Sequence, residues 1–285
     1  LGGPFEPGPT AAGHRPRLAH QAPELCGALS GGGVERYCGP RLGGGRASLA
    51  VLSRGRIDFG VSRGGNGDYS KAFGVDPSVG RQTFQHNLSL MLQCWSPKPV
   101  QLEEYDFDVQ PKPLQQPHPP VYIGTYNEQT AEWAGQQGYR LIQHGIQSMP
   151  NICRIVRAFT AGGGKARHAP IGRFVYVSAS DTAARIELFP VLQLLTDRLR
   201  KAGIPSRAGT LTEEELQPER FYREMVIAGG PDTCREQLQE LSRMTGSQRV
   251  NCLIAFFGFL PPDLLQRSLQ LFADEIMPRL GVGCR

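Results

Sequence analysis

The sequence predicts an α/β protein built on a parallel β-sheet. Short apolar segments of strand type alternate with longer segments in which apolar residues recur every three or four positions. At least five such strand–helix units follow one another, and right-handed crossovers would arrange them as the later part of a barrel. This alternation fits an open doubly wound sheet nearly as well, so the pattern leaves both arrangements open.

The predicted strands are short segments rich in apolar residues, as expected for strands buried in a parallel sheet. In the first of them, apolar and polar residues alternate. The strands are predicted over residues 56–61, 121–125, 140–144, 171–180 and 249–257.

The predicted helices follow the strands and show helical periodicity. In the first helix, one apolar stripe is formed by Phe84, Leu88, Met91, Leu92 and Trp95. In the second, the asparagine at position 127 is a plausible N-cap and the glycine at position 138 a C-terminal stop. The helices are predicted over residues 79–95, 127–139, 151–164, 181–200, 230–241 and 261–280.

The remaining segments divide the chain. Residues 1–46 contain 12 glycines and 6 prolines and show no sustained periodicity, so they are predicted to be an irregular tail. Residues 47–285 form the predicted folded domain. Within it, a proline-rich connector spans residues 110–120, and a polar region at about 201–225 interrupts the alternation as an inserted loop or short helices.

Composition and charge exclude several classes of protein. The hydrophobic content of 40% is sufficient for a substantial core, and no apolar run is long enough for a membrane helix. The net charge of +5 is spread along the chain without a basic block, which argues against nucleic acid as a partner. The N-terminus does not resemble a signal peptide, and the seven cysteines never occur as C-x-x-C. A reducing, cytoplasmic location is therefore predicted.

Charged and polar residues follow the ends of two predicted strands. Ser62 and Arg63 follow the first strand, while Asn127 and Thr130 follow the second and open its helix. Ligands of parallel sheets bind at this edge, where helix N-termini favour phosphate or another anion. Together with Arg81 at the next helix start, these residues would form an anion clamp. Ordinary helix caps, a surface arginine and a glycine-rich loop explain the same residues, so both interpretations stay open.

Other catalytic patterns are weaker. His144 lies at the end of the third predicted strand, where a catalytic role and a polar capping role are about equally plausible. The six histidines show no zinc-binding spacing, and no metal site is predicted. The glycine-rich segments at 43–46 and 162–165 lack the remainder of a phosphate-loop motif.

Four phrases of the chain resemble the bacterial luciferase-like family of flavin-dependent monooxygenases. "VLSRGRIDFGVSRGG" is similar to the phrase "LDxLSxGRxxFGxGRG", which enters the family's fourth barrel strand. "PPVYIGTYNEQTAEWAGQQGY" resembles the fifth strand and its helix. "IAGGPDTCREQLQEL" and "SLQLFADEIMPRL" resemble the closing helix and the C-terminus. The resemblance covers about residues 47–285, whereas residues 1–46 do not resemble the family's first three strands.

The resemblance implies a fold and a set of site residues. The fold would be a TIM (β/α)8 barrel of the luciferase-like type, with its first three strands unrecognisable or missing. The resemblance assigns the contacts to the flavin phosphate to five residues, and Ser62 and His144 would lie near the reactive ring. The five phosphate-binding residues are Arg63, Arg81, Tyr126, Asn127 and Thr130.

The implied function is that of a flavin-dependent monooxygenase. It would use reduced flavin mononucleotide (FMN), supplied by a separate flavin reductase, and O₂ to oxygenate a small organic substrate. A homodimer is expected. Two alternatives stay open, namely an oxidoreductase of the same fold that uses the deazaflavin F420, and a non-catalytic flavin-binding relative.

Overall fold

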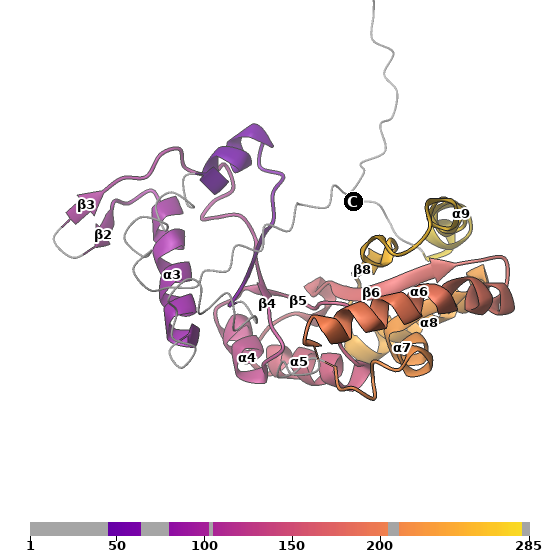
Figure 1. Cartoon of the computed structure of the whole chain (residues 1–285). Helices are drawn as coiled ribbons and strands as arrows, with labels where there is room; N and C mark the ends of the chain where they lie inside the picture. The colour runs from indigo at the N-terminus through magenta and orange to yellow at the C-terminus, as the bar shows by residue number, and fades with distance from the viewer. Residues whose placement is uncertain (1–44, 64–79, 103–104, 205–210, 281–285) are drawn as a thin grey trace, which may run out of the picture.

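The computed structural model describes residues 45–63, 80–102, 105–204 and 211–280. Its elements alternate between strands and helices over most of this length, which confirms the predicted α/β class. Residues 1–44 of the predicted irregular tail lie outside the described residues. Its last two residues, 45 and 46, belong to a helix over residues 45–52, so the prediction is wrong there. Figure 1 shows the short central strands between α3 on one side and the α6–α9 helices on the other.

Five strands form one parallel series in the order β1–β4–β5–β6–β8. Each of the first three pairs with its neighbour, and a parallel bridge from Gln143 to Ile171 continues the series into β6. The N-terminal half of β6 then pairs with β8. The five strands are β1 (Phe59–Ser62), β4 (Val121–Gly124), β5 (Arg140–Ile142), β6 (Ile171–Val177) and β8 (Val250–Leu253).

The structure adds a parallel strand that the sequence analysis did not predict, β7 (Val226–Gly229). β7 pairs with the C-terminal half of β6, so Phe174 has Val226 as its partner on one edge and Leu253 of β8 on the other. β7 therefore lies along the same edge of β6 on which Gln143 forms its bridge to Ile171, closer to the C-terminal end of β6. β7 follows directly on the predicted polar region at about 201–225, and the next predicted helix begins at residue 230, directly after it, so it lacks the flanking loops that mark the other strands.

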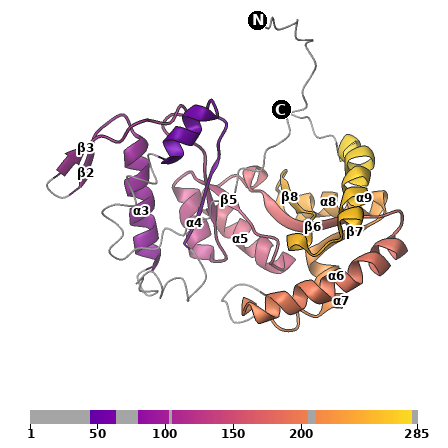
Figure 2. The same cartoon turned by 45° about the horizontal axis from the view of Figure 1, so that its top comes forward.

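The helices follow the prediction closely, and Figure 2 shows α4 and α5 lying together beside the first strands. An antiparallel hairpin follows α3 and consists of β2 (Val100–Leu102) and β3 (Tyr105–Phe107). The helices are α3 (Gly80–Trp95), α4 (Glu128–Gln136), α5 (Met149–Ala161), α6 (Asp181–Lys201), α7 (Pro218–Met225), α8 (Pro231–Thr245) and α9 (Pro262–Leu271). The last predicted helix is interrupted after Leu271, where π and 3₁₀ turns continue to Leu280.

All five predicted strands are longer than the observed ones. The second and third overrun β4 and β5 by only one and two residues, and the other three differ more. The first begins at Phe59 instead of residue 56, and the fourth ends at Val177 instead of residue 180. The last ends at Leu253, because Phe256 and Phe257 take positive φ angles of 48° and 56° that no strand accommodates. The periodicity of the sequence therefore located the strands but not the residues at which their hydrogen bonding begins and ends.

Two buried clusters form the core on opposite faces of the sheet. The first contains Val61, Ile123 and Val175 and packs against α4, α5 and α8. The second contains Phe174 and Tyr176 and packs against α6 and α7. Because successive strand residues point to opposite faces, β6 contributes to both clusters and is buried along its whole length.

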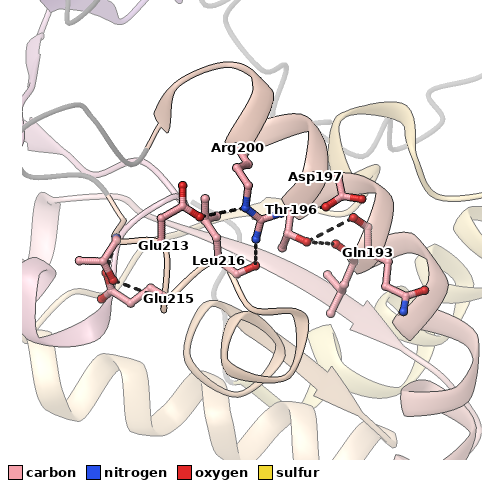
Figure 3. Close-up of polar contacts among 9 residues, drawn as sticks. Gln193, Thr196, Asp197, Arg200, Glu213, Glu215 and Leu216 are labelled. Atoms are coloured by element: carbon pink, nitrogen blue, oxygen red, sulfur yellow. Dashed lines mark hydrogen bonds and ion pairs between the residues drawn. The ribbon is translucent and has the colours of Figure 1, made fainter.

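The predicted polar insertion consists of a turn and the short helix α7 in its described part. Figure 3 shows how Arg200, near the end of α6, anchors this turn. The guanidinium donates to Glu213 at 2.9 Å, to the carbonyl of Leu216 at 3.4 Å and to Asp197 at 2.8 Å. The bonds to Glu213 and Leu216 link α6 to the segment that precedes α7, and β7 follows α7 directly.

Candidate functional site

The turn between β4 and α4 presents an ordered helix N-terminus. The side chain of Asn127 accepts hydrogen bonds from the backbone N–H of Thr130 at 3.0 Å and from its hydroxyl at 3.3 Å. The hydroxyl of Thr125 in turn accepts from the N–H of Asn127 at 3.0 Å. The predicted N-cap is confirmed, and the amide groups of the first helical turn point outward with the positive end of the helix dipole.

Arg81 of α3 reaches this helix N-terminus from a segment 46 residues away. Its guanidinium donates to Asn127 at 3.2 Å and to the side chain of Gln129 at 2.5 Å. The Nε of Arg81 is buried without a hydrogen-bond partner among the described residues. A cation therefore lies against the positive end of a helix, which is the arrangement that attracts an anion.

Ser62 and Arg63 occupy the neighbouring strand end. Ser62 pairs in register with Gly124, the last residue of β4. Arg63 lies beside the start of α3, since a Cβ built on Gly80 would be 3.8 Å from the Cδ of Arg63. Both arginines of the predicted clamp thus lie near the start of α3.

The structure brings most of the predicted site residues to one edge of the sheet. Arg81, Asn127 and Thr130 are joined by hydrogen bonds, and Tyr126 lies in the same turn, half-buried. The geometry places these residues together without testing what they bind.

His144 lies at the same edge but one strand further on, just past the end of β5. Its ring stacks on Phe257, with the ring centroids 6.2 Å apart, and its Nδ1 accepts from the N–H of Ile146 at 3.2 Å. Gly124 of β4 separates the strand ends that lead to Ser62 and to His144. The two predicted catalytic side chains therefore flank β4 from opposite sides.

A series of buried polar side chains, which the sequence analysis missed, connects β6 to the turn that follows β4. Arg173 of β6 donates to the carbonyl of Gln147 at 2.9 Å. The amide of Gln147 donates to Gln143 at 2.9 Å, and Gln143 donates to the carbonyl of Thr125 at 3.2 Å. The series connects β6 to the turn that precedes Asn127. A charged residue within the apolar segment "IGRFVYV" was the available signal.

Arg173 is a buried cation without a carboxylate partner among the described residues. Its side chain is 2% exposed, and burial lowers its pKa to about 10. The carbonyl of Gln147 compensates part of the lost hydration, and Met149 also contacts the guanidinium. Breaking this contact would leave the charge unsolvated, so the loop that bears His144 is held firmly in place.

The N-terminus of α8 differs from that of α4, because a carboxylate of the chain already occupies it. Asp181 accepts from the N–H of Gly230 at 2.8 Å and from the hydroxyl of Thr233 at 3.0 Å. Gly229 permits this approach, since a Cβ there would lie 2.5 Å from the Asp181 carboxylate. At the α4 N-terminus, by contrast, the guanidinium of Arg81 meets the cap, and the first-turn carboxylate of Glu128 pairs with Arg154.

A second polar group at the C-terminal end of β6 is saturated by internal bonds. Glu187 accepts from the hydroxyls of Tyr176 at 2.7 Å and Ser178 at 2.6 Å, and Arg267 lies 3.2 Å from its other oxygen. Burial opposes ionisation of Glu187, but the bonds from Ser178 and Tyr176 outweigh it and lower its pKa. Burial, followed by the bond to Glu187, raises the pKa of Tyr176. These bonds join β6 to α6 and α9, so Glu187 and Tyr176 serve the packing of the fold.

Two further observations concern only the described residues. Their histidine, cysteine and acidic side chains form no group of three or more that could hold a metal ion. Their helices include none that is both long and apolar enough to cross a membrane.

The parallel series of strands, with cationic and polar residues at their C-terminal ends, defines an α/β protein of the class in which ligands bind at that edge of the sheet. A family model described as luciferase-like monooxygenase matches residues 42–248. The chain belongs to the luciferase-like monooxygenase family and has its TIM-barrel fold. Membership in this family supports an oxidoreductase activity.

Individual relatives are distant in sequence. The uncharacterized protein y4wF of Sinorhizobium fredii is 23% identical over 251 residues, covering 82% of this chain and 71% of the relative. The monooxygenase RslO1 from Streptomyces bottropensis is 21% identical with a TM-score of 0.67, and the match covers 84% of this chain and 74% of RslO1.

Two other solved structures contain bound cofactors. The oxygenating constituent of 3,6-diketocamphane monooxygenase from Pseudomonas putida, in complex with FMN, is 15% identical with a TM-score of 0.66, covering 87% of this chain and 77% of that one. An F420-dependent secondary alcohol dehydrogenase with an F420–acetone adduct is 16% identical with a TM-score of 0.62, covering 86% and 76%. At these identities the similarity establishes the fold alone.

Proposed function

We propose that this protein is a flavin-dependent monooxygenase that binds reduced FMN and uses O₂ to oxygenate a small organic substrate. The observation that supports it most is the cationic N-terminus of α4, where Arg81 contacts the N-cap Asn127 and has a buried Nε without a hydrogen-bond partner among the described residues. A flavin phosphate would supply the acceptor that this nitrogen lacks. The FMN complex of the diketocamphane enzyme, which shares the fold, is consistent with this proposal.

We assign the proposed site residues to three roles: binding the phosphate, holding the turn in position and flanking the flavin ring. Arg63, Arg81, Tyr126, Asn127 and Thr130 would hold the phosphate, and the Gln143–Gln147–Arg173 chain would keep their turn in position. Ser62 and His144 would flank the ring from the two strands beside β4. Bound reduced flavin supplies the electrons that activate oxygen. A separate flavin reductase would deliver it, and the active form would be a homodimer.

A second candidate is hydride transfer with the deazaflavin F420. One observation favours it, namely that F420-dependent enzymes, including the secondary alcohol dehydrogenase, share the fold of this chain at comparable TM-scores. A non-catalytic flavin-binding role is the third, and it predicts flavin binding without turnover.

An anaerobic titration with reduced FMN tests the proposed site. We expect Arg81→Ala to weaken binding by about 10- to 100-fold, since a charged hydrogen bond to phosphate contributes about 1.5–3 kcal/mol. Lys98→Ala is the matched control, because Lys98 is an exposed cation beyond the opposite end of α3. Equal binding by wild type and Arg81→Ala would reject the phosphate site.

The same titration with F420 distinguishes the candidates. Tighter binding of F420 than of reduced FMN, with hydride transfer from a test alcohol to oxidised F420, would replace the monooxygenase proposal. Binding of reduced FMN without substrate-stimulated oxygen consumption across a panel of small ketones, sulfonates and alkanes would favour the non-catalytic role.

A further inference from the structure

A cluster of cations lies at the opposite, N-terminal end of the strands. Tyr122 is the second residue of β4, and its hydroxyl accepts from Arg140 at 2.7 Å and from Arg249 at 3.1 Å. The two donating nitrogens share one acceptor, so they lie within about 6 Å of each other. The guanidinium of Arg140 also lies over the Tyr122 ring, 5.3 Å from its centroid.

Further positive groups surround this pair. Burial lowers the pKa of His168, and the charges of Arg167, Arg140, Arg249 and Lys165 lower it further. Arg167 also donates to the His168 ring at 3.1 Å. Four cations and a histidine thus gather at one end of the sheet, although like charges repel one another at these separations.

No carboxylate of the described residues pairs with any of these cations. The ion pairs among the described residues involve other arginines and one other lysine. Arg140 and Arg249 each donate to the phenol through a single nitrogen, so within this part of the chain most of their donors are available to a ligand. The cluster therefore combines uncompensated charge with unused donors.

The backbone around the cluster is held in place before any ligand binds. The hydroxyl of Ser247, which is buried, donates to the carbonyl of Ala169 at 2.6 Å and lies 3.0 Å from that of Arg249. The N–H of Gln248 donates to the carbonyl of Arg167 at 3.4 Å. The segments that bear Arg167 and Arg249 are therefore tied together, which reduces the cost of ordering the donors on binding.

We propose that Tyr122, Arg140 and Arg249, with Lys165, Arg167 and His168, form a second binding site, for a doubly charged oxyanion such as a phosphate group or a dicarboxylate. Two guanidinium groups converging on one point suit an anion with several oxygens. The site is separate from the α4 N-terminus, because it lies where the strands begin and not where they end. It does not depend on the proposed flavin chemistry.

Binding is measured by calorimetry with inorganic phosphate and, separately, with succinate, at constant ionic strength. The Arg81→Ala background removes the main cation of the other anion site. In that background we expect Arg140→Gln and Arg249→Gln each to weaken binding by about tenfold or more, and Lys98→Gln to leave it unchanged. Preference for phosphate or for succinate identifies which source of the oxyanion the site accepts.

The pKa of His168 shows whether the ligand binds beside this histidine. The His168 ring protons are followed by NMR, with His168→Gln used for assignment, and we expect phosphate or succinate to raise the pKa of His168 by offsetting the nearby cations. Each single variant keeps one guanidinium on Tyr122, and circular dichroism verifies folding. Absence of binding in the Arg81→Ala background, binding that survives both glutamine variants, or an unmoved His168 would overturn the proposal.

Discussion

At the scale of single residues, Asn127 serves two purposes with one side-chain oxygen. It caps α4 by accepting from Thr130, and it orients Arg81 over the helix N-terminus. The α8 N-terminus shows the alternative, in which the carboxylate of Asp181 occupies the equivalent place. A carboxylate from α6 thus lies against the N-cap Gly230 of α8, whereas the guanidinium of Arg81 lies against the N-cap Asn127 of α4.

Asn127→Asp separates capping from anion binding. A carboxylate caps as well as an amide and favours the helix dipole, so we expect the free energy of unfolding to stay equal or rise by up to about 1 kcal/mol. Binding of reduced FMN should fall by about tenfold or more, because the new charge repels the phosphate.

Urea unfolding and anaerobic titration measure the two effects. Asn127→Ala is the comparison variant, and it should lose about 1 kcal/mol of stability together with the bond to Arg81. If the aspartate variant bound reduced FMN as tightly as wild type, the phosphate would not lie at this helix start.

His168 makes stability depend on pH. Its folded-state pKa is lowered by burial and by the surrounding cations, so between that value and the ordinary pKa of about 6.5 the unfolded chain binds the additional proton. This contribution to stability is present above about pH 6.5 and is lost as the pH falls.

Chemical denaturation between about pH 5 and pH 8 tests this contribution. The free energy of unfolding should depend less steeply on pH in His168→Gln than in wild type, and Arg249→Gln should give an intermediate slope because it removes one of the responsible charges. Parallel curves for wild type and His168→Gln would show that the histidine does not contribute.

At the scale of elements, α4 and α5 approach each other through glycines. A Cβ on Gly135 would lie 2.3 Å from the carbonyl of Phe159, and one on Gly162 would come even closer to Glu132. This contact fixes the position of α4 on the sheet, and hence the position of its N-terminus beside Arg81. Salt bridge Arg154–Glu128, at 2.7 Å, joins the same two helices but is exposed and contributes little.

Gly135→Ala should destabilise the protein by about 1–3 kcal/mol, because two helix backbones must separate to admit one methyl group. Alanine is otherwise the better helix former, so propensity alone predicts the opposite sign. Urea unfolding followed by circular dichroism measures the change, with the exposed neighbour Gln136→Ala as a control expected within about 0.5 kcal/mol of wild type. A stabilised Gly135→Ala variant would contradict the close contact.

At the scale of the whole molecule, the parallel series of the described residues ends at β1 and at β8, and β7 adds a further unpaired edge. β1 pairs only with β4 there, and β7 and β8 each pair only with β6. Unpaired strand edges recruit further strands, and a second copy of the chain is the partner that our dimer proposal supplies. Gly60 lies at the middle of β1, exposed and with open space around a built Cβ.

Gly60→Lys should weaken self-association, because a charged side chain on an edge strand disfavours pairing. We expect the dissociation constant of the dimer to rise by about tenfold, measured by light scattering across a concentration series. Gly60→Ala controls for the loss of glycine flexibility. A wild-type chain that stays monomeric throughout, or variants that associate alike, would reject an interface at β1.

The amino-acid sequence alone predicts the class of the fold, the order of most helices and strands, and the N-cap at Asn127, because periodicity and capping act over a few neighbouring residues. It also placed Ser62, Arg63 and Arg81 near the edge where ligands bind. Their use of that edge for FMN stays a prediction.

The remaining features depend on contacts between residues that are far apart in the sequence. β7 forms because β6 offers a free edge, and no short-range pattern marks it. The Arg173–Gln147 bond joins residues 26 apart, and the Arg249–Tyr122 bond joins residues 127 apart. Such contacts depend on how the strands assemble into one sheet, since buried polar groups must find partners wherever packing brings them. The buried polar chain and the second cation cluster are therefore properties of the folded molecule.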